Sequence, residues 1–424
     1  MDTEILAAVA AEQPAMVDLV RELVAAPTLL GAEAAGQAVM RRAFAELGLE
    51  PVDVPLDAAA LAAHPGGAPH SWDVGGKVNV VADWGGGDGR SLILNGHIDV
   101  VSPEPVALWT GDPFAARVEG DWMYGRGAGD MKSGLAAMVG AVRGLQRLGL
   151  HPQGRVQLQS VVEEECTGNG ALACVLAGQT ADAAILTEPT QGAIWNAQVG
   201  VLWFQVRAIG APAHAGEAAE GANAIEASYA VIEALRALEA DLNASKPPLF
   251  EAYPHPINLN VGMIRGGDWP STVAGECMLS CRLALYPGER VDDLKARVEE
   301  TIASVSAGSR FSFEVLYDGF QCEGYELDPD APLIAGLADA AARVSGQAPP
   351  LFASTATTDA RTFVLYGDTP AVSFGPLAES EHGVDERVFV PSIVQTAQAL
   401  ALFVADWCGA GRAEHEVGAA DSAD

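Results

Sequence analysis

The chain has 424 residues, of which 49% are hydrophobic and 19% are charged, a balance typical of a globular protein and not of a disordered one. Its 24 lysines and arginines against 56 aspartates and glutamates give a net charge of −32, which repels phosphate backbones and argues against nucleic acid as a partner. This length predicts two domains, and no uninterrupted apolar run is long enough to predict a membrane span.

Helical periodicity and strand-like runs alternate over residues 1–199. Such alternation favours a mostly parallel sheet covered by helices on both faces. A turn rich in glycine follows Trp84 and separates two of the strands. The expected helices are 4–24, Gln37–Leu47 and Ser133–Leu148, and the expected strands are Val78–Ala82, Ser91–Leu94, Val156–Val162 and Ala183–Leu186.

The pattern changes near residue 200. Residues 200–318 follow a β-α-β-β-α-β order, which is typical of a ferredoxin-like α+β unit. We therefore expect this unit to be inserted into an α/β domain made of residues 1–199 and 319–424. Within the insert the expected strands are Leu202–Ile209, Asn258–Ile264, Cys277–Leu285 and Phe311–Tyr317, and the expected helices are Ala222–Leu242 and Val291–Ser304.

After the insert, the α/β pattern resumes with a helix at Leu333–Val344 and continues to Trp407. The tail from about Gly409 is rich in alanine, glycine and glutamate, and we expect it to fray.

The six cysteines are scattered without a tight framework. Cys277 and Cys281 would lie about 13 Å apart on one strand, which is too far for a disulfide. Residues 1–4 are acidic, whereas a secretory signal would be basic. These features predict a cytoplasmic protein with reduced thiols.

Two sequence frames suggest a metal site. His97 lies in the frame 94–101, and Asp130 lies in the glycine-rich frame 125–134. Imidazole and carboxylate suit divalent metals such as zinc. Both frames lie where an apolar strand gives way to a loop, which is where open α/β sheets build their sites.

Three further frames add possible ligands. The run Glu163–Glu165 ends one strand, Glu188 ends another, and His382 precedes a second acidic stretch. Alone, each is more typical of a solvated loop. A run of like charges at an apolar strand end is nevertheless costly unless a cation lies there.

Together, the five frames resemble those of the co-catalytic zinc deacylases and exopeptidases. This family includes acetylornithine deacetylase, succinyl-diaminopimelate desuccinylase, aminoacylase and glutamate carboxypeptidase. The resemblance covers roughly residues 15–408. It implies an α/β, mostly parallel-sheet di-metal hydrolase domain, with residues 200–318 as an inserted ferredoxin-like lid and dimerisation domain.

The resemblance also implies the metal ligands. Asp130 would bridge two divalent ions, His97 and Glu188 would complete one site, and Glu165 and His382 would complete the other. Zinc is the expected metal, while cobalt and manganese accept the same nitrogen and oxygen ligands.

The acidic run is assigned from the family frame acid-Glu-Glu, in which the base precedes the ligand. Glu164 is then the general base and Glu163 the leading acid, with a register shift by one as the alternative. Asp99 lies two residues after His97, so both point the same way on a strand, and Asp99 would orient the imidazole. The family usually has a cis peptide bond after the bridging aspartate, here Asp130.

Two cations would lower the pKa of a shared water and polarise the scissile carbonyl. Glu164 would take the proton of that water and later deliver it to the leaving amine. A dry cleft lined by other carboxylates should raise the pKa of Glu164 toward this task.

The resemblance assigns two residues of the insert. His214 matches a lid histidine that reaches across a dimer to stabilise the oxyanion in the partner's site. Arg282 matches an arginine that grips the substrate carboxylate, for which a planar guanidinium is suited. The alternatives are a surface turn for His214 and a salt bridge for Arg282.

Other substrate contacts are less well defined. Thr357 lies in a segment that matches a loop lining the pocket. Ser271 stands where the family often has asparagine, so the substrate contact usual there is either absent or altered. Trp195 and Trp269 are expected in the core, with the pocket wall as the alternative.

The predicted protein is a homodimeric di-metal amidohydrolase that removes an acyl group from an N-acyl amino acid or related amine. Its substrate would be a small molecule with an amide and a carboxylate. The alternatives are a metallo-carboxypeptidase or dipeptidase, and a deformylase or aminohydrolase acting on an aromatic or heterocyclic amine. A non-catalytic metal-binding protein is disfavoured because Glu164 is present.

Overall fold

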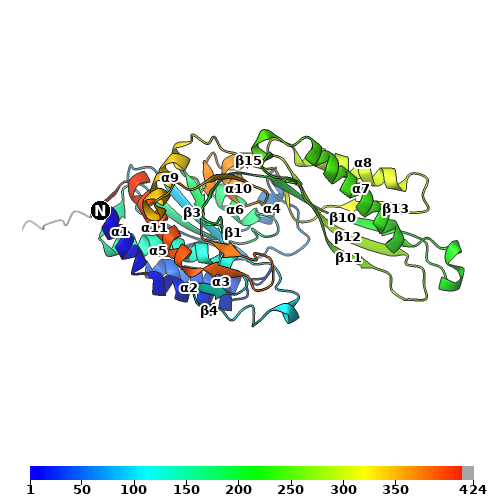
Figure 1. The fold of residues 1–424 in the computed structure, drawn as a ribbon, viewed down its shortest axis with the longest axis horizontal. Coiled ribbons are helices and arrows are strands. Elements are labelled where there is room, and N and C mark those ends of the chain that lie inside the picture. Colours follow the sequence, from blue (N-terminus) through cyan, green and yellow to red (C-terminus); the bar gives the residue numbers. More distant parts are fainter. Residues whose placement is uncertain (413–424) are drawn as a thin grey trace, which may run out of the picture.

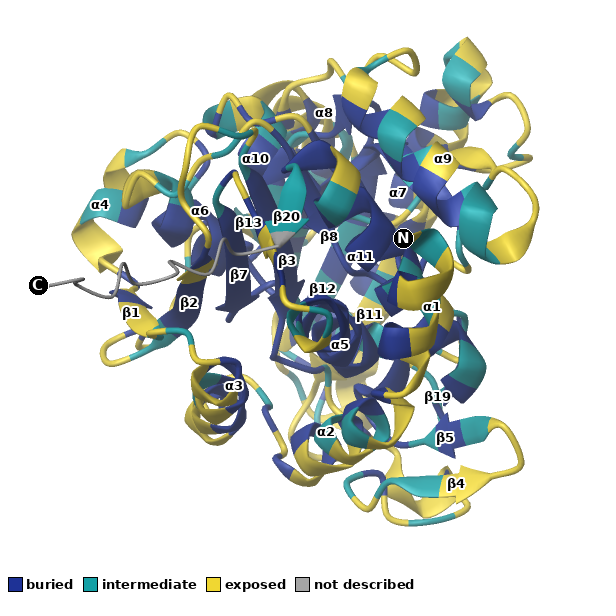
Figure 2. Ribbon diagram, turned by 90° about the vertical axis from the view of Figure 1, so that its left-hand side faces the viewer, coloured by how far each residue is buried: buried dark blue, intermediate teal, exposed yellow. Residues whose placement is uncertain are grey.

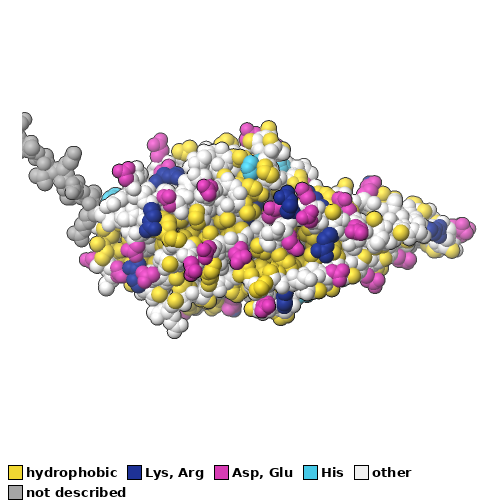
Figure 3. Space-filling model, turned by 90° about the horizontal axis from the view of Figure 1, so that it is seen from above, with side chains coloured by type: hydrophobic (Ala, Val, Ile, Leu, Met, Phe, Trp, Pro, Cys, Tyr) yellow, Lys and Arg dark blue, Asp and Glu magenta, His cyan; other side chains and the backbone are white. Residues whose placement is uncertain are grey.

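The computed structural model describes residues 1–412. Figure 1 shows an elongated molecule in which the N-terminal and C-terminal parts of the chain form a broad body. The middle of the chain, drawn in green and yellow, extends from this body as a narrower one. Each body has its own hydrophobic core. Figure 3 shows acidic side chains distributed along both bodies.

The broad body is built on a nine-stranded sheet. Its strand order is β1-β2-β7-β3-β8-β17-β9-β15, with β16 also paired to β9. The strands are β1 (Val52–Pro55), β2 (Val78–Trp84), β3 (Leu92–His97), β7 (Val156–Val161), β8 (Ala184–Leu186), β9 (Ile194–Gln198), β15 (Tyr325–Glu326), β16 (Leu351–Ser354) and β17 (Ala371–Ser373).

The sheet is mixed, so the prediction of a mostly parallel sheet is wrong. The central strands β7, β3, β8 and β17 run parallel, but β1, β2 and β15 pair antiparallel to their neighbours, as do β17 and β9. The connection between β2 and β3 explains why these two strands do not run parallel. Their connection is a short turn, and parallel strands need a crossover of a dozen or more residues.

Helices cover both faces of this sheet, and Figure 2 shows the buried strands between them. Along β3, Leu94 packs into the large core with α5 and α11, whereas Ile93 faces the opposite side with α6 and α10. This alternation follows from the two-residue period of a strand. The helices of the broad body are α1 (Asp2–Ala10), α2 (Gln13–Ala25), α3 (Ala34–Glu46), α4 (Ala58–Ala63), α5 (Ser133–Arg147), α6 (Asn169–Leu176), α9 (Pro332–Ser345), α10 (Ala360–Tyr366) and α11 (Val390–Trp407).

The single helix predicted for residues 4–24 is two helices. The chain leaves the first at Ala10 and starts the second at Gln13, with Pro14 in its first turn. Proline lacks a backbone N–H and fits only the first turn of a helix.

The narrower body has an antiparallel sheet in the order β11-β12-β10-β13, with β14 also paired to β10. Its chain order is the predicted β-α-β-β-α-β. The two helices pack together on one face, where Phe204 and Leu279 belong to the core. The elements are β10 (Gly200–Ile209), α7 (Ala224–Ala244), β11 (Leu259–Gly266), β12 (Glu276–Leu285), α8 (Val291–Ser306), β13 (Ser312–Leu316) and β14 (Gln321–Cys322).

Two small sheets complete the fold, and one includes the start of the predicted frayed tail. Residues 410–412 form β20 and pair with β6, so this part is held by backbone hydrogen bonds, while residues 413–424 of the tail lie outside the described residues. The strands are β4 (Arg117–Glu119), β5 (Trp122–Tyr124), β18 (Ala378–Glu379) and β19 (Arg387–Phe389) in one sheet, and β6 (Leu150–Pro152) and β20 (Ala410–Arg412) in the other.

None of the helices within residues 1–412 combines the length and the hydropathy needed to cross a membrane. All six cysteines are buried and free. The two on β12, Cys277 and Cys281, are thus unbridged, as their spacing predicted.

Candidate metal centre and substrate cavity

The candidate site lies at the carboxyl-terminal edge of three neighbouring parallel strands. His97 is the last residue of β3, the acidic run follows β7, and Glu188 follows β8. Because parallel strands end at the same edge, frames far apart in the sequence meet there.

His97 is buried, with 1% of its surface exposed. Its Nε2 lies 3.0 Å from Oδ1 of Asp130, and its Nδ1 lies 2.9 Å from the backbone oxygen of Asp99. A hydrogen bond at Nδ1 leaves Nε2 as the nitrogen directed to the carboxylate, which is the orientation required of a metal ligand.

Asp130 lies between two imidazoles. Its second oxygen, Oδ2, is 3.4 Å from Nε2 of His382, and the peptide bond to Met131 is cis, as the resemblance implied. Burial alone would raise the pKa of Asp130, but the contacts with His382 and His97 outweigh it and hold the pKa well below its ordinary value. The carboxylate therefore presents one oxygen to each side.

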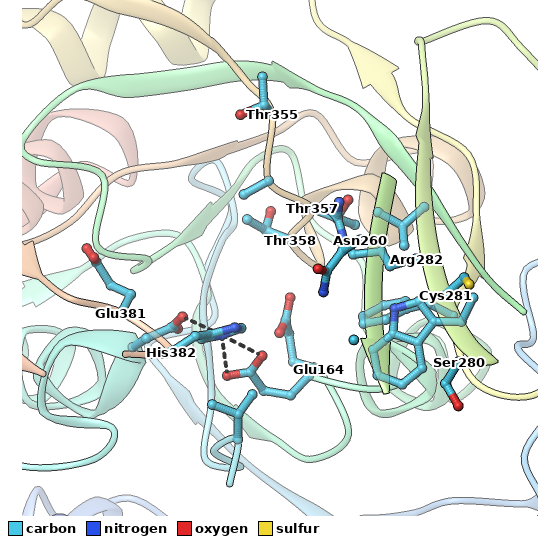
Figure 4. Close-up of a pocket in the computed structure, with 18 of the residues that line it drawn as sticks. Glu164, Asn260, Ser280, Cys281, Arg282, Thr355, Thr357, Thr358, Glu381 and His382 are labelled. Atoms are coloured by element: carbon cyan, nitrogen blue, oxygen red, sulfur yellow. Dashed lines mark hydrogen bonds and ion pairs between the residues drawn. The ribbon is translucent and has the colours of Figure 1, made fainter. Parts of the chain in front are cut away.

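His382 and Glu165 form the second half of the centre. Nε2 of His382 is 3.2 and 3.0 Å from the two carboxylate oxygens of Glu165. The negative charge of Glu165 raises the pKa of His382 to about 11. Ligand atoms of His97, Asp130 and Glu165 all lie within 4.8 Å of one another, and Figure 4 shows His382 joined to neighbouring carboxylates by dashed lines.

Glu164 and Glu188 lie on the His97 side. Each places Oε2 3.8 Å from Nε2 of His97, and each is almost completely buried. Burial raises the pKa of both carboxyls well above the ordinary range. Carboxylates gathered around two imidazoles in a desolvated site leave an excess of negative charge, which divalent cations would balance.

Glu163 is excluded from this centre by its own contacts. Its Oε1 accepts hydrogen bonds from Lys77 and from the Trp72 indole, both at 2.8 Å, and its Oε2 accepts one from Thr167 at 2.8 Å. Its φ of +63° turns the chain between Glu163 and the next residue. The geometry thus supports the register in which Glu164 and Glu165 face the centre.

Asp99 contacts both His97 and the acidic run. Its carboxylate accepts the backbone N–H groups of Glu164 at 3.2 Å and Glu165 at 3.0 Å, whereas its Oδ1 is 3.7 Å from Nδ1 of His97. The carbonyl oxygen of Asp99 orients the imidazole, and its side chain holds the two glutamates in place. Burial raises the pKa of Asp99 to about 7.

Glu386, which has no predicted role, holds the Asp130 loop. This buried carboxylate accepts the backbone N–H groups of Gly127, Gly129 and Asp130 at 3.1, 2.9 and 3.0 Å, and it pairs with Arg126. The only sequence signal was an acidic residue four positions after His382.

A cavity of about 920 Å³ connects the centre to the helix-free face of the narrower body. Glu164 and His382 line it from the broad body, and Arg282 lines it from β12. Thr357 also lines it and donates a hydrogen bond to the backbone oxygen of Val199 at 3.0 Å.

Arg282 makes no ion pair with any carboxylate of residues 1–412. The alternative of a salt-bridged strand-end arginine is therefore excluded for the described chain. Burial lowers the pKa of Arg282, as expected for a cation that lacks a partner.

The cavity does not contain every predicted residue. His214 and Ser271 are exposed and lie beside each other, since His214 bridges to Thr272 and Ala215 donates to the backbone oxygen of Ser271. Trp269 is 68% exposed and so is not in the core, whereas Trp195 lines the cavity.

A model of the family described as Peptidase family M20/M25/M40 matches residues 93–406. The chain belongs to this family. Among its relatives is the N-formyl-4-amino-5-aminomethyl-2-methylpyrimidine deformylase of Halalkalibacterium halodurans, 30% identical over 346 residues that cover 75% of this chain and 79% of the relative. The succinyl-diaminopimelate desuccinylase of Dinoroseobacter shibae is 32% identical over 337 residues, covering 76% and 85%.

Among solved structures, a dinuclear metal-binding peptidase of the M20 family from Bacillus subtilis matches with a TM-score of 0.62 at 17% identity, over 94% of this chain and 99% of that one. This likeness shows the shared fold. As a member of the M20/M25/M40 family with such relatives, the chain is a hydrolase that acts on amide C–N bonds.

Proposed function

We propose that this M20-family hydrolase is a di-metal deacylase that releases an acyl group from an N-acyl amino acid or a related amine. The observation that carries the proposal is the Asp130 carboxylate, whose two oxygens face two separate groups of ligands. The proposed ligands are His97 and Glu188 for one ion, Glu165 and His382 for the other, and Asp130 for both. Zinc is the proposed metal, with cobalt and manganese as substitutes.

The residues fit such a metal pair because nitrogen and oxygen donors converge in a buried, negatively charged site. When bound, the ions would supply a water of lowered pKa and polarise the scissile carbonyl. Glu164 is the proposed general base. Its raised pKa lets it hold the proton taken from water and transfer it to the leaving nitrogen.

Arg282 supports a substrate that carries a carboxylate. It is a desolvated cation that makes no ion pair with the carboxylates of residues 1–412, and a substrate carboxylate would satisfy it with paired hydrogen bonds. Thr357 would line the same pocket near the centre.

We also propose that residues 200–318 act as a lid and dimerisation domain. His214 is exposed and outside its own cavity, so it would reach the oxyanion only in a partner's site. Ser271 lies beside it and would contact substrate from the same side. A homodimer is thereby part of the proposal.

A deformylase or aminohydrolase acting on a heterocyclic amine is the second candidate. The aromatic side chains that line the cavity favour it, as does the relative whose name specifies a formylated aminopyrimidine.

The test is a substrate panel with amine detection on protein loaded separately with Zn²⁺, Co²⁺ or Mn²⁺. The panel holds N-acyl amino acids, dipeptides and N-formyl aromatic amines. Release of amine from acyl amino acids supports the leading proposal, and exclusive release from N-formyl heterocyclic amines replaces it with the second. Cleavage of dipeptides alone would make the enzyme a dipeptidase, and no release from any member would refute both proposals.

A further inference from the structure

A row of side chains crosses the cavity face of the narrower body. Asn260 on β11 pairs with Arg282 on β12, which pairs with Trp203 on β10. The backbone N–H of Trp203 donates to the oxygen of Phe320 at 2.7 Å. Directly opposed residues point to the same face of a sheet, and all four line the cavity. The row therefore has a polar end and an aromatic end.

The aromatic end is rigid. The rings of Trp203 and Phe320 meet edge to face, with centroids 5.4 Å apart. The Trp203 ring also lies against the backbone of Gly319, where an added Cβ would come within 2.5 Å of it. A wall held in this way offers its apolar surface to a ligand without first being ordered.

A third ring comes from the broad body. Trp72 lines the cavity and is fixed by the hydrogen bond from its indole to buried Glu163. The same segment is attached beside Phe320, because Pro69 accepts the backbone N–H of Gly319 at 2.8 Å. This brings Trp72 to the side of the cavity that carries the aromatic end of the row.

Asp318 adds one hydrogen-bond acceptor to this wall. It lines the cavity, and its Oδ2 accepts the hydroxyl of Ser71 at 2.6 Å. Its Oδ1 has no hydrogen bond to residues 1–412. A carboxylate anchored through one oxygen presents the other to N–H donors of a ligand.

We propose that Trp72, Trp203, Asp318 and Phe320 form a subsite for a planar ring that bears an amino group. The aromatic faces would stack on the ring, and Asp318 would accept the amino N–H. The inference rests on the proposed function, because it names the substrate class of the same site. It predicts selectivity for an aminophenyl or aminopyrimidine ring over an aliphatic group of similar size.

The test uses N-acetyl-4-aminophenylalanine, N-acetylphenylalanine and N-acetylcyclohexylalanine, and the N-formyl amines with the same three rings. Wild-type kcat/KM should fall in that order. Trp72→Leu and Trp203→Leu should each lower kcat/KM about threefold to tenfold for the two planar substrates, mainly through KM, and lower it less for the cyclohexyl substrate, which loses apolar contact but no ring stacking. Asp318→Asn should lower kcat/KM only for the aminophenyl substrate. Trp122→Leu and Asp121→Asn, outside the cavity, are the matched controls.

Equal kcat/KM for planar and cyclohexyl substrates would overturn the subsite while leaving the deacylase intact. An equal fall in kcat/KM for all three substrates in the tryptophan variants would also overturn the subsite, because a general structural defect gives that pattern. If neither series is hydrolysed, calorimetry with the metal-loaded enzyme tests the subsite independently of the proposed function. Tighter binding of 4-aminobenzylamine than of cyclohexylmethylamine supports the subsite, and equal binding overturns it.

Discussion

The two walls of the cavity are built in opposite ways. At the candidate metal centre the groups already contact one another: Asp130 meets two histidines, and Asp99 accepts the backbone N–H of Glu164. On the facing sheet, Arg282 and Oδ1 of Asp318 have no such protein partner within residues 1–412. The first wall fixes the chemistry, and the second leaves hydrogen-bonding capacity for a substrate. We expect changes in the first to reduce kcat and changes in the second to raise KM.

The largest expected effect is that of Glu164→Gln. Loss of the base should lower kcat by about 10²–10⁴, and the metal content measured by mass spectrometry should stay unchanged because Glu164 is not a proposed ligand. Glu50→Gln, at an exposed position, is the control. Full activity of Glu164→Gln would show that another residue is the base.

The next largest effect is expected on stability, from removing Lys77, which pairs with Glu163 of the acidic run. Lys77 joins Glu163 and Glu33 at 2.8 and 2.7 Å, with all three side chains buried. Lys77→Met leaves two buried carboxylates without their cation and should cost about 3–5 kcal/mol in the free energy of unfolding.

Urea unfolding measures this cost. Lys295→Met is the control, because its ion-pair partner Asp292 is 74% exposed and the pair should contribute at most about 1 kcal/mol. Equal losses in the two variants would refute the anchoring role of Lys77.

His214→Ala should lower kcat by about 10²–10³, the usual effect of removing one oxyanion donor. The sharper measurement mixes this variant with Glu164→Gln after dissociation and reassociation. A mixed dimer has one site with both residues intact if His214 acts on its partner. Recovery of activity is the expected result, and no recovery despite mixed dimers would show that His214 does not act across the interface.

The smallest of these four effects is expected for Arg282→Lys. Replacing a paired guanidinium contact by a single ammonium should raise KM by about tenfold to a hundredfold for substrates with a carboxylate. Esters of the same substrates provide the control, because they lack the negative charge. An equal rise for acid and ester would mean that Arg282 shapes the pocket without binding the carboxylate.

The sequence alone was sufficient to predict features that depend on short segments of the chain. The β-α-β-β-α-β order of the narrower body follows from hydrophobic periodicity, and the family of the chain follows from the order of frames such as those of His97 and Asp130. These features depend on residues close together in the chain, so they can be recognised without knowledge of the fold.

Tertiary structure decided what depends on contacts between distant segments. The direction of β2 could not be read from its apolar residues, which look alike in either orientation. Glu386 reaches Asp130 across more than two hundred residues of chain, and Trp72 meets Glu163 across 91. The sequence also identified the acidic run but left its register open. Burial and hydrogen bonding assign Glu163 to the interior and turn Glu164 toward the cavity, because a buried carboxylate must find its partners in three dimensions.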